Sequence, residues 1–190
     1  MPEVRPKQRL ALPVDDGYFA VVQDIWENEQ VQSMRQYPQH GVTSCLQHSL
    51  NVSYLSYRFC LAHGLDARAA ARAGLLHDLF LYDWHAHRRE KGERLHGFTH
   101  PGKALENARR LFSLTPKESD IILRHMWPLT LTPPNSREAY VVVLVDKYTS
   151  LLETFRCEVL PDSAEPKAVG QRQKADTAWR KLWGIFGQRV

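Results

Sequence analysis

The sequence predicts a single all-α domain, and three observations support this fold class. Apolar residues recur at spacings of three and four along most of the chain, as on one face of an amphipathic helix. Capping residues stand before several of these segments. No pair of alternating strands with hairpin turn residues occurs, and no Gly-rich loop follows a strand, which excludes a nucleotide-binding α/β fold. A length of 190 residues fits one domain, covering 1–190, better than two.

The first predicted helix covers about residues 18–37. Phe19, Val22, Ile25 and Trp26 follow helical spacing and form its apolar face. We expect this helix to pack as an N-terminal flank on the domain core, which we place at 37–157.

Two further helices are expected before residue 80. The first runs from Thr43 to His63, where Gly64 supplies a stop signal. Asp66 is a cap for the second, which covers 67–79 and contains a run of alanines and Gly74. These small residues allow a neighbouring helix to approach closely.

The stretch 81–98 breaks the helical period and is rich in histidine, arginine and aromatic residues. We interpret it as a long irregular excursion, a feature that is often functional in compact domains. Helical spacing resumes at about Pro101, after Thr99 as a candidate cap, and continues to Phe112.

The later helices have distinct start signals. Thr115 and Glu118 form a capping box around a proline, and this helix should end before Pro128. A second capping box is expected at Asn135 for a helix that carries residues 140–155. Within it, residues 141–145 alone would also fit a strand, but length and caps favour a buried helix. A C-terminal helix at about 165–187 is expected to dock three aromatic residues on the core: Trp179, Trp183 and Phe186.

Composition and charge exclude several classes of protein. With 43% apolar and 24% charged residues the chain fits a globular protein, and no apolar run approaches the roughly 20 residues that cross a bilayer. Charges and prolines near the N-terminus do not fit a signal peptide, and three cysteines cannot all pair, so we expect a cytoplasmic protein. The net charge of +4 lies at 165–190 without a binding motif, which disfavours nucleic acid as a partner. A homodimer is left open.

Five ligand-type side chains stand where helices should carry leucine or valine: His48, His77, Asp78, His125 and Asp146. A buried carboxylate costs several kcal/mol unless a cation or hydrogen bonds compensate, and a metal ion removes that cost. Each histidine alone is more often a hydrogen-bonded core residue, and Asp146 alone could pair with an arginine. Together they indicate a metal site.

The order His48, His77-Asp78, Asp146 resembles the H…HD…D signature of the HD-domain metal-dependent phosphohydrolases. His100 and His125 resemble the additional histidine pair of the small bacterial members that bind two metals. The likeness covers roughly residues 37–155. It implies a helical bundle of the HD-domain type and an enzyme of the phosphohydrolase class.

The resemblance also implies a ligand set. One ion would be held by His48, His77, Asp78 and Asp146, and Asp78 would bridge to a second ion held by His100 and His125. Two divalent or transition metal ions can deprotonate a shared water, which implies cleavage of a phosphate ester or anhydride by a metal-bridged hydroxide. Asp78 and Lys103 are the implied catalytic residues. The metal is left open among Fe, Mn, Ni, Co, Zn and Mg.

The implied partner is a small phosphorylated substrate, with a nucleotide favoured. Lys103 lies three residues after His100 and therefore on the same helix face, where it can contact phosphate. Lys147 adjoins Asp146 but lies about 100° away around the helix. The other substrate-binding candidates are His40, Arg88 and Trp84. No GYP signature follows the HD pair, so a cyclic dinucleotide loses support.

Two alternatives stay open at this stage. In a one-metal 5'-nucleotidase of the same family, His100 and His125 would contact the substrate. In a regulatory protein that binds metal or nucleotide, the ligands would be present without turnover. Metal analysis and a phosphate-release panel distinguish the three.

Overall fold

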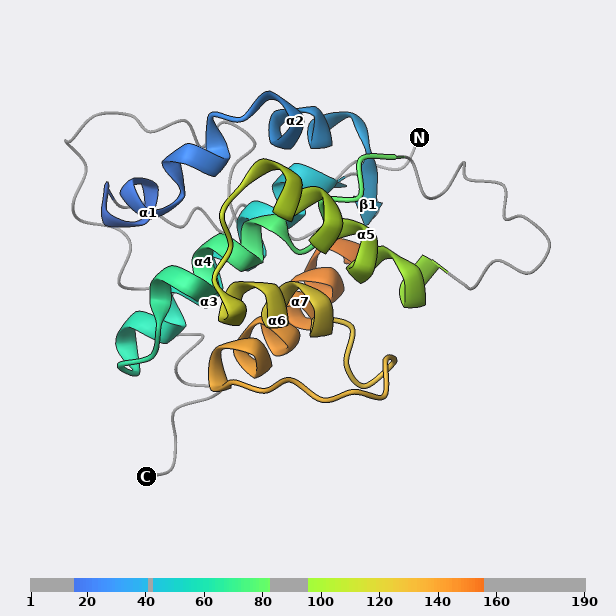
Figure 1. The fold of residues 1–190 in the computed structure, drawn as a ribbon. Coiled ribbons are helices and arrows are strands. Elements are labelled where there is room, and N and C mark those ends of the chain that lie inside the picture. The colour runs from blue at the N-terminus through green and yellow to red at the C-terminus, as the bar shows by residue number, and fades with distance from the viewer. Residues whose placement is uncertain (1–15, 41–42, 83–95, 156–190) are drawn as a thin grey trace, which may run out of the picture.

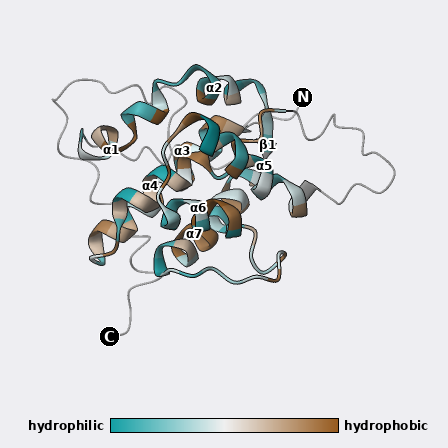
Figure 2. Cartoon of the chain, viewed as in Figure 1, coloured by the Kyte–Doolittle hydropathy of each residue, from teal (hydrophilic) through white to brown (hydrophobic). Residues whose placement is uncertain are grey.

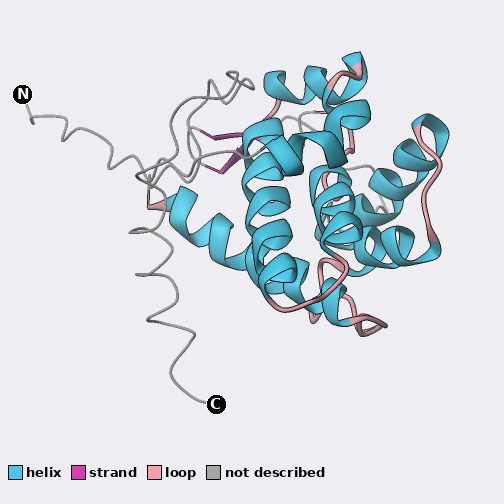
Figure 3. Cartoon of the chain, turned by 90° about the vertical axis from the view of Figure 1, so that its left-hand side faces the viewer, coloured by secondary structure: helices cyan, strands magenta, loops and turns pink. Residues whose placement is uncertain are grey.

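The computed structural model describes residues 16–40, 43–82 and 96–155. Within these residues the fold is helical apart from one short two-stranded ribbon, which confirms the predicted all-α class (Figures 1 and 3). The α-helices are α1 (Asp16–Trp26), α2 (Glu29–Gln32), α3 (Cys45–Ala62), α4 (Ala67–Leu76), α5 (His96–Leu111), α6 (Pro116–Arg124) and α7 (Arg137–Thr154). A 3-10 turn, η1 (Ser33–Gln36), and the antiparallel strands β1 (Pro38–His40) and β2 (Thr43–Ser44) connect α2 to α3.

Helix α3 lies at the centre of the described bundle and packs on both α4 and α7. Its turn into α4 contains Gly64, whose φ of +66° is the left-handed conformation that favours glycine. Asp66 then caps α4 by accepting a hydrogen bond from the Ala69 amide at 3.0 Å, as predicted. A Cβ added at Gly74 would lie 2.9 Å from the Cα of Ser53, which confirms the expected close helix contact.

Buried apolar side chains of these helices form the core, and hydrophobic stretches recur along the central helices in Figure 2. Arg72 of α4 crosses this core and joins three helices. Its guanidinium donates to Asp24 of α1 and, at 3.1 Å, to the buried carboxylate of Glu118 in α6. None of the described helices has the length and apolarity needed to cross a membrane.

The prediction of one helix over 18–37 is wrong in its second half. The side chain of Asn28 accepts hydrogen bonds from the amides of Gln30 and Val31, at 3.0 and 3.3 Å, and so begins the short helix α2. An asparagine that caps a new helix competes with continuation of the preceding one. The ribbon that follows has only three and two residues per strand, too few for alternation to be visible in the sequence.

Helix α4 ends at Leu76, three residues earlier than predicted. The imidazole Nδ1 of His77 lies 2.8 Å from the carbonyl oxygen of Gly74 and satisfies one of the carbonyls left open at the helix end. His77 and Asp78 therefore follow the helix instead of lying within it.

The expected helix start at Pro101 with Thr99 as its cap is also wrong. Helix α5 begins at His96 and includes Pro101, although proline cannot donate to the carbonyl four residues back. Tertiary packing holds the earlier turn, because buried His100 lies against the Phe80 ring and against His125.

The capping box of Thr115 and Glu118 at the start of α6 is confirmed. Helix α7 is also confirmed as a helix through residues 141–145, but its cap is Ser136, whose hydroxyl accepts from the Ala139 amide at 3.2 Å. The predicted cap Asn135 binds Asp120 instead, with its side-chain amide 2.7 Å from the carboxylate. Most of the 81–98 excursion and the expected C-terminal helix lie outside the described residues.

Candidate metal centre

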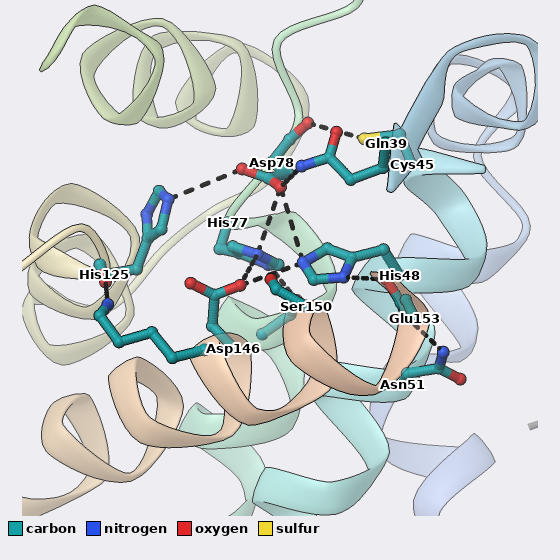
Figure 4. A network of polar contacts seen from close by, with 12 residues as sticks. Gln39, Cys45, His48, Asn51, His77, Asp78, His125, Asp146, Ser150 and Glu153 are labelled. Atoms are coloured by element: carbon teal, nitrogen blue, oxygen red, sulfur yellow. Dashed lines mark hydrogen bonds and ion pairs between the residues drawn. The ribbon is translucent and has the colours of Figure 1, made fainter. Parts of the chain in front are cut away.

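Six side chains from separate parts of the bundle meet in its interior, and all six residues are buried. They are His48 of α3, His77 and Asp78 after α4, His100 of α5, His125 after α6, and Asp146 of α7. The structure thus brings together all the side chains for which the sequence suggested a ligand role. Figure 4 shows several of them around Asp78.

The first group surrounds one oxygen of Asp78. His77 Nε2 lies 3.4 Å from Asp78 Oδ2, and His48 Nε2 lies 3.8 Å from the same oxygen. Asp146 Oδ1 is 3.1 Å from His48 Nε2 and 3.6 Å from His77 Nε2. The ligand atoms of His48, His77 and Asp78 lie within 4.8 Å of one another, and Asp146 adjoins both imidazole nitrogens.

The second group surrounds the other oxygen of Asp78. His100 Nε2 lies 3.3 Å and His125 Nε2 lies 3.6 Å from Asp78 Oδ1. These two imidazole nitrogens are 2.7 Å apart. Asp78 is thus common to both groups and offers each of them a different oxygen.

Two of the imidazoles are oriented by helix ends. The Nδ1 atoms of His77 and His125 each lie 2.8 Å from the carbonyl oxygen three residues back, Gly74 and Ile122 respectively. A carbonyl only accepts, so Nδ1 carries the hydrogen and Nε2 keeps its lone pair. His77 and His125 are therefore oriented so that Nε2 can act as the ligand atom.

A bound cation fits these atoms. His77 Nε2 and Asp78 Oδ1 are buried and make no hydrogen bond with any described residue. A buried polar atom without a partner costs about 1–3 kcal/mol, which a cation at this point would offset. Imidazole nitrogens suit Zn, Fe and Ni while carboxylate oxygens suit Mn and Mg, so the donor set leaves the metal's identity open.

Electrostatics keep Asp78, Asp146 and His125 in the protonation states that metal binding needs. Burial raises the pKa of Asp78, but the neighbouring imidazoles, His77 first, outweigh it and lower the pKa overall. The neighbouring imidazoles of His48 and His77 likewise lower the pKa of Asp146 against the effect of burial. Burial, with repulsion from His100 and His77, lowers the pKa of His125 to about 3, so this imidazole is neutral.

Burial lowers the pKa of His77, but the carboxylates of Asp78 and Asp146 outweigh burial and raise it. The same balance is stronger at His48. Burial lowers its pKa, but hydrogen bonds to Asp146 and Glu153 outweigh burial and hold the pKa well above its ordinary value. A metal ion that binds at Nε2 would therefore displace a proton from His48.

Two residues at the site were missed by sequence reasoning. Gln39 of β1 donates from Nε2 to Asp78 Oδ2, and nothing in the sequence marks it. Glu153 of α7 lies 2.8 Å from His48 Nδ1 through Oε2. Its position seven residues after Asp146, two turns along one helix face, is a signal that could have identified it.

The two described lysine candidates, Lys103 and Lys147, have different neighbours. Lys103 Nζ is 4.9 Å from the centre of the Tyr82 ring. Lys147, despite its position around the helix from Asp146, reaches to 3.4 Å from the backbone oxygen of His125, and burial lowers its pKa. A role for either in substrate binding stays a prediction. Trp84, Arg88 and the His40 side chain lie outside the described part of the chain.

Comparison with protein families gives one match, to the HD domain, over residues 45–151. The matched segment is more than half of the 190 residues and contains all six clustered side chains. No curated protein and no solved structure gives a significant match to the chain. Gln39 and Glu153 fall outside the matched segment.

Proposed function

This chain belongs to the HD-domain family of metal-dependent phosphohydrolases, and on that premise we propose that it cleaves a phosphate ester or anhydride of a small molecule with the help of two metal ions. A nucleotide is the favoured substrate class. The observation that carries the proposal is the position of Asp78, which offers one oxygen to each of two buried histidine groups. Such sharing is the arrangement expected of a carboxylate that bridges two ions.

The proposed ligand sets follow from the two groups. His48, His77 and Asp78, with Asp146 beside the two imidazoles, would hold one ion, and Asp78, His100 and His125 would hold the other. Bound there, two ions would supply a water nucleophile near neutral pH and offset the negative charge of the phosphate.

The protein's own residues would supply rigidity and charge. The helix-end carbonyls that hold His77 and His125 leave their Nε2 atoms little freedom to reorient, as a preorganised site requires. Lys103 and Lys147 would contribute positive charge on the side of His100 and His125 and so bind the phosphate. In this proposal Lys103 binds substrate and does not hold metal.

Phosphate release tests the proposal directly. Metal-loaded protein is assayed on nucleoside mono-, di- and triphosphates and on a simple phosphodiester, beside Asp78→Asn and the control Glu106→Gln, which alters an exposed carboxylate of α5. We expect the parent and the control to hydrolyse at least one compound and Asp78→Asn to be slower by more than about 100-fold. A protein that holds two ions but releases phosphate from none of these would support the regulatory alternative.

The metal count separates the enzyme alternatives. A parent protein that binds only one ion and still releases phosphate from nucleoside monophosphates would be a one-metal 5'-nucleotidase. In that case His100 and His125, whose Nε2 atoms are 2.7 Å apart, would be assigned to substrate contact.

A further inference from the structure

Besides Asp78 and Asp146, a third buried carboxylate contacts the first group of ligands, on the side of His48 that faces away from Asp78. Glu153 of α7 is 1% exposed, and its Oε2 lies 2.8 Å from His48 Nδ1 (Figure 4). Its other oxygen, Oε1, accepts a hydrogen bond from the side-chain amide of Asn51 at 2.8 Å. Both partners belong to α3, so this carboxylate joins the two helices that carry His48 and Asp146.

The hydrogen bonds around Glu153 have a fixed direction. Gln47 donates to Asn51 Oδ1 at 3.0 Å, so the amide nitrogen of Asn51 is the atom that faces Glu153. A carboxylate accepts only, and the hydrogen between Glu153 and His48 therefore sits on Nδ1. A metal ion bound at Nε2 would take the lone pair of that nitrogen beside Asp146 and Asp78. Without an ion, Nε2 can carry a second hydrogen and donate it to Asp146 Oδ1, 3.1 Å away.

His48 is held differently from the other two oriented histidines. His77 and His125 donate to neutral backbone carbonyls, whereas His48 donates to a carboxylate. A charged acceptor makes a stronger hydrogen bond and increases the basicity of the opposite ring nitrogen. Among the described residues, the only ionic partner of Glu153 is His48. A buried carboxylate with this one ionic contact acts on the metal site through the imidazole.

We propose that Glu153 is a positioning residue that holds His48 in its ligand orientation and strengthens it as a donor to the first ion. This inference rests on the proposed two-metal site. It concerns a residue beyond the segment that matches the HD domain, and it assigns Glu153 no contact with substrate.

The test measures metal affinity and not turnover. Glu153→Gln keeps the shape of the side chain and removes its charge. Its control, Glu138→Gln, alters another buried carboxylate of α7, which accepts from Lys117 and the Asp66 amide away from the ligands. Mn²⁺ and Zn²⁺ are titrated into each folded apoprotein against a competing chelator, and Co²⁺ absorption spectra are recorded.

We expect Glu153→Gln to lower the affinity for one of the two ions by about 10–100-fold and to leave the affinity for the other within about threefold of the parent's. The Co²⁺ spectrum should also change. Glu138→Gln should lower stability while both affinities stay unchanged. If the parent binds two ions and Glu153→Gln binds both equally tightly, the role of Glu153 is overturned and the proposed function stands. A parent that binds no ion overturns both.

A second variant tests the inference if Glu153→Gln does not fold. Asn51→Ala removes the hydrogen bond that fixes Oε1 and leaves Glu153 free to rotate away from His48. It should lower the affinity for the same ion, but by less than Glu153→Gln does. Unchanged affinities for both ions in Asn51→Ala would overturn the inference.

Discussion

At the scale of single residues, the site depends on how each imidazole is held. His77 and His125 each end a helix, where an unpaired carbonyl three residues back fixes Nδ1 and leaves Nε2 for a ligand role. The separate oxygens of Asp78 then divide the histidines into two groups. The assignment of two ions depends on the second group.

Replacing both His100 and His125 with alanine tests that assignment. Without these imidazoles only the set around His48 and His77 stays intact, so about one ion should be retained and phosphate release should fall by several orders of magnitude. His63→Ala, which alters an exposed histidine, is the control. Metal content of the purified variants is the measurement. A double variant that retains as much metal as the parent would remove His100 and His125 from the ligand set.

Lys103→Ala tests the proposed phosphate contact. If Lys103 binds substrate, the variant should show a higher KM or a lower kcat, with a change in kcat/KM of about tenfold or more, and an unchanged metal content. Arg109→Ala, at an exposed position of the same helix, is the control. Loss of metal from Lys103→Ala, or parental kinetics, would exclude the proposed role.

Five of the six clustered side chains were predictable because each is a ligand-type residue in an apolar, helical sequence context. His100, beside Thr99 and Pro101, was predictable only from the resemblance to the family. Gln39 was not predictable, since it reaches Asp78 from a three-residue strand whose pairing depends on tertiary structure. Glu153 carried a weaker signal, because one glutamate in a long helix is ordinarily a solvent-exposed residue. Only packing against α3 shows that this carboxylate is buried behind His48.

At the scale of elements, the position of His77 and Asp78 depends on the contact between α3 and α4. Gly74→Ala would place a methyl group 2.9 Å from the Ser53 backbone, and the helices would have to move apart. We expect a loss of about 1–3 kcal/mol in the free energy of unfolding, measured by urea denaturation of the apoprotein.

Gly102→Ala is the matched control, because an added methyl group there meets nothing within 4 Å and α5 is already helical. It should be neutral or stabilise by up to about 1 kcal/mol. Equal effects of the two substitutions would show that helix propensity, and not the α3–α4 contact, sets the cost at Gly74.

Helix existence could be predicted where caps and periodicity agree, as at Thr115 and Asp66. The predicted helix boundaries were wrong where a local hydrogen bond competed with the pattern of apolar and capping residues. Asn28 caps a new helix instead of continuing the old one, and Asn135 binds Asp120 and leaves the cap to Ser136. The predicted start of α5 was wrong because of tertiary packing. The burial of His100 outweighs the usual tendency of a proline such as Pro101 to begin or break a helix.

At the scale of the whole molecule, metal binding should be linked to folding. The proposed ligands come from α3, α5 and α7 and from the residues that follow α4 and α6, so the complete site exists only when these helices are assembled. An ion at 100 times its dissociation constant adds about 2.7 kcal/mol to stability, which for a chain of this size corresponds to a rise in Tm of about 5–10 °C.

Thermal melts of chelated and metal-loaded protein measure this linkage. Removal of metal should lower the Tm of the parent, and the Asp78→Asn variant should melt at one temperature in both conditions. Identical melting curves of the parent after verified metal removal would show that its folding is not coupled to a buried metal site. The division of the chain into a core at 37–157 with flanking helices stays a prediction.

The central claim is that Asp78 joins two metal ions in one buried centre. Elemental analysis of anaerobically purified protein tests it most directly, with the parent compared to Asp78→Asn. We expect two ions per chain in the parent and the loss of both in the variant, because each histidine group faces one oxygen of this carboxylate. A parent that holds no stoichiometric metal, or a variant that holds as much as the parent, would contradict the claim.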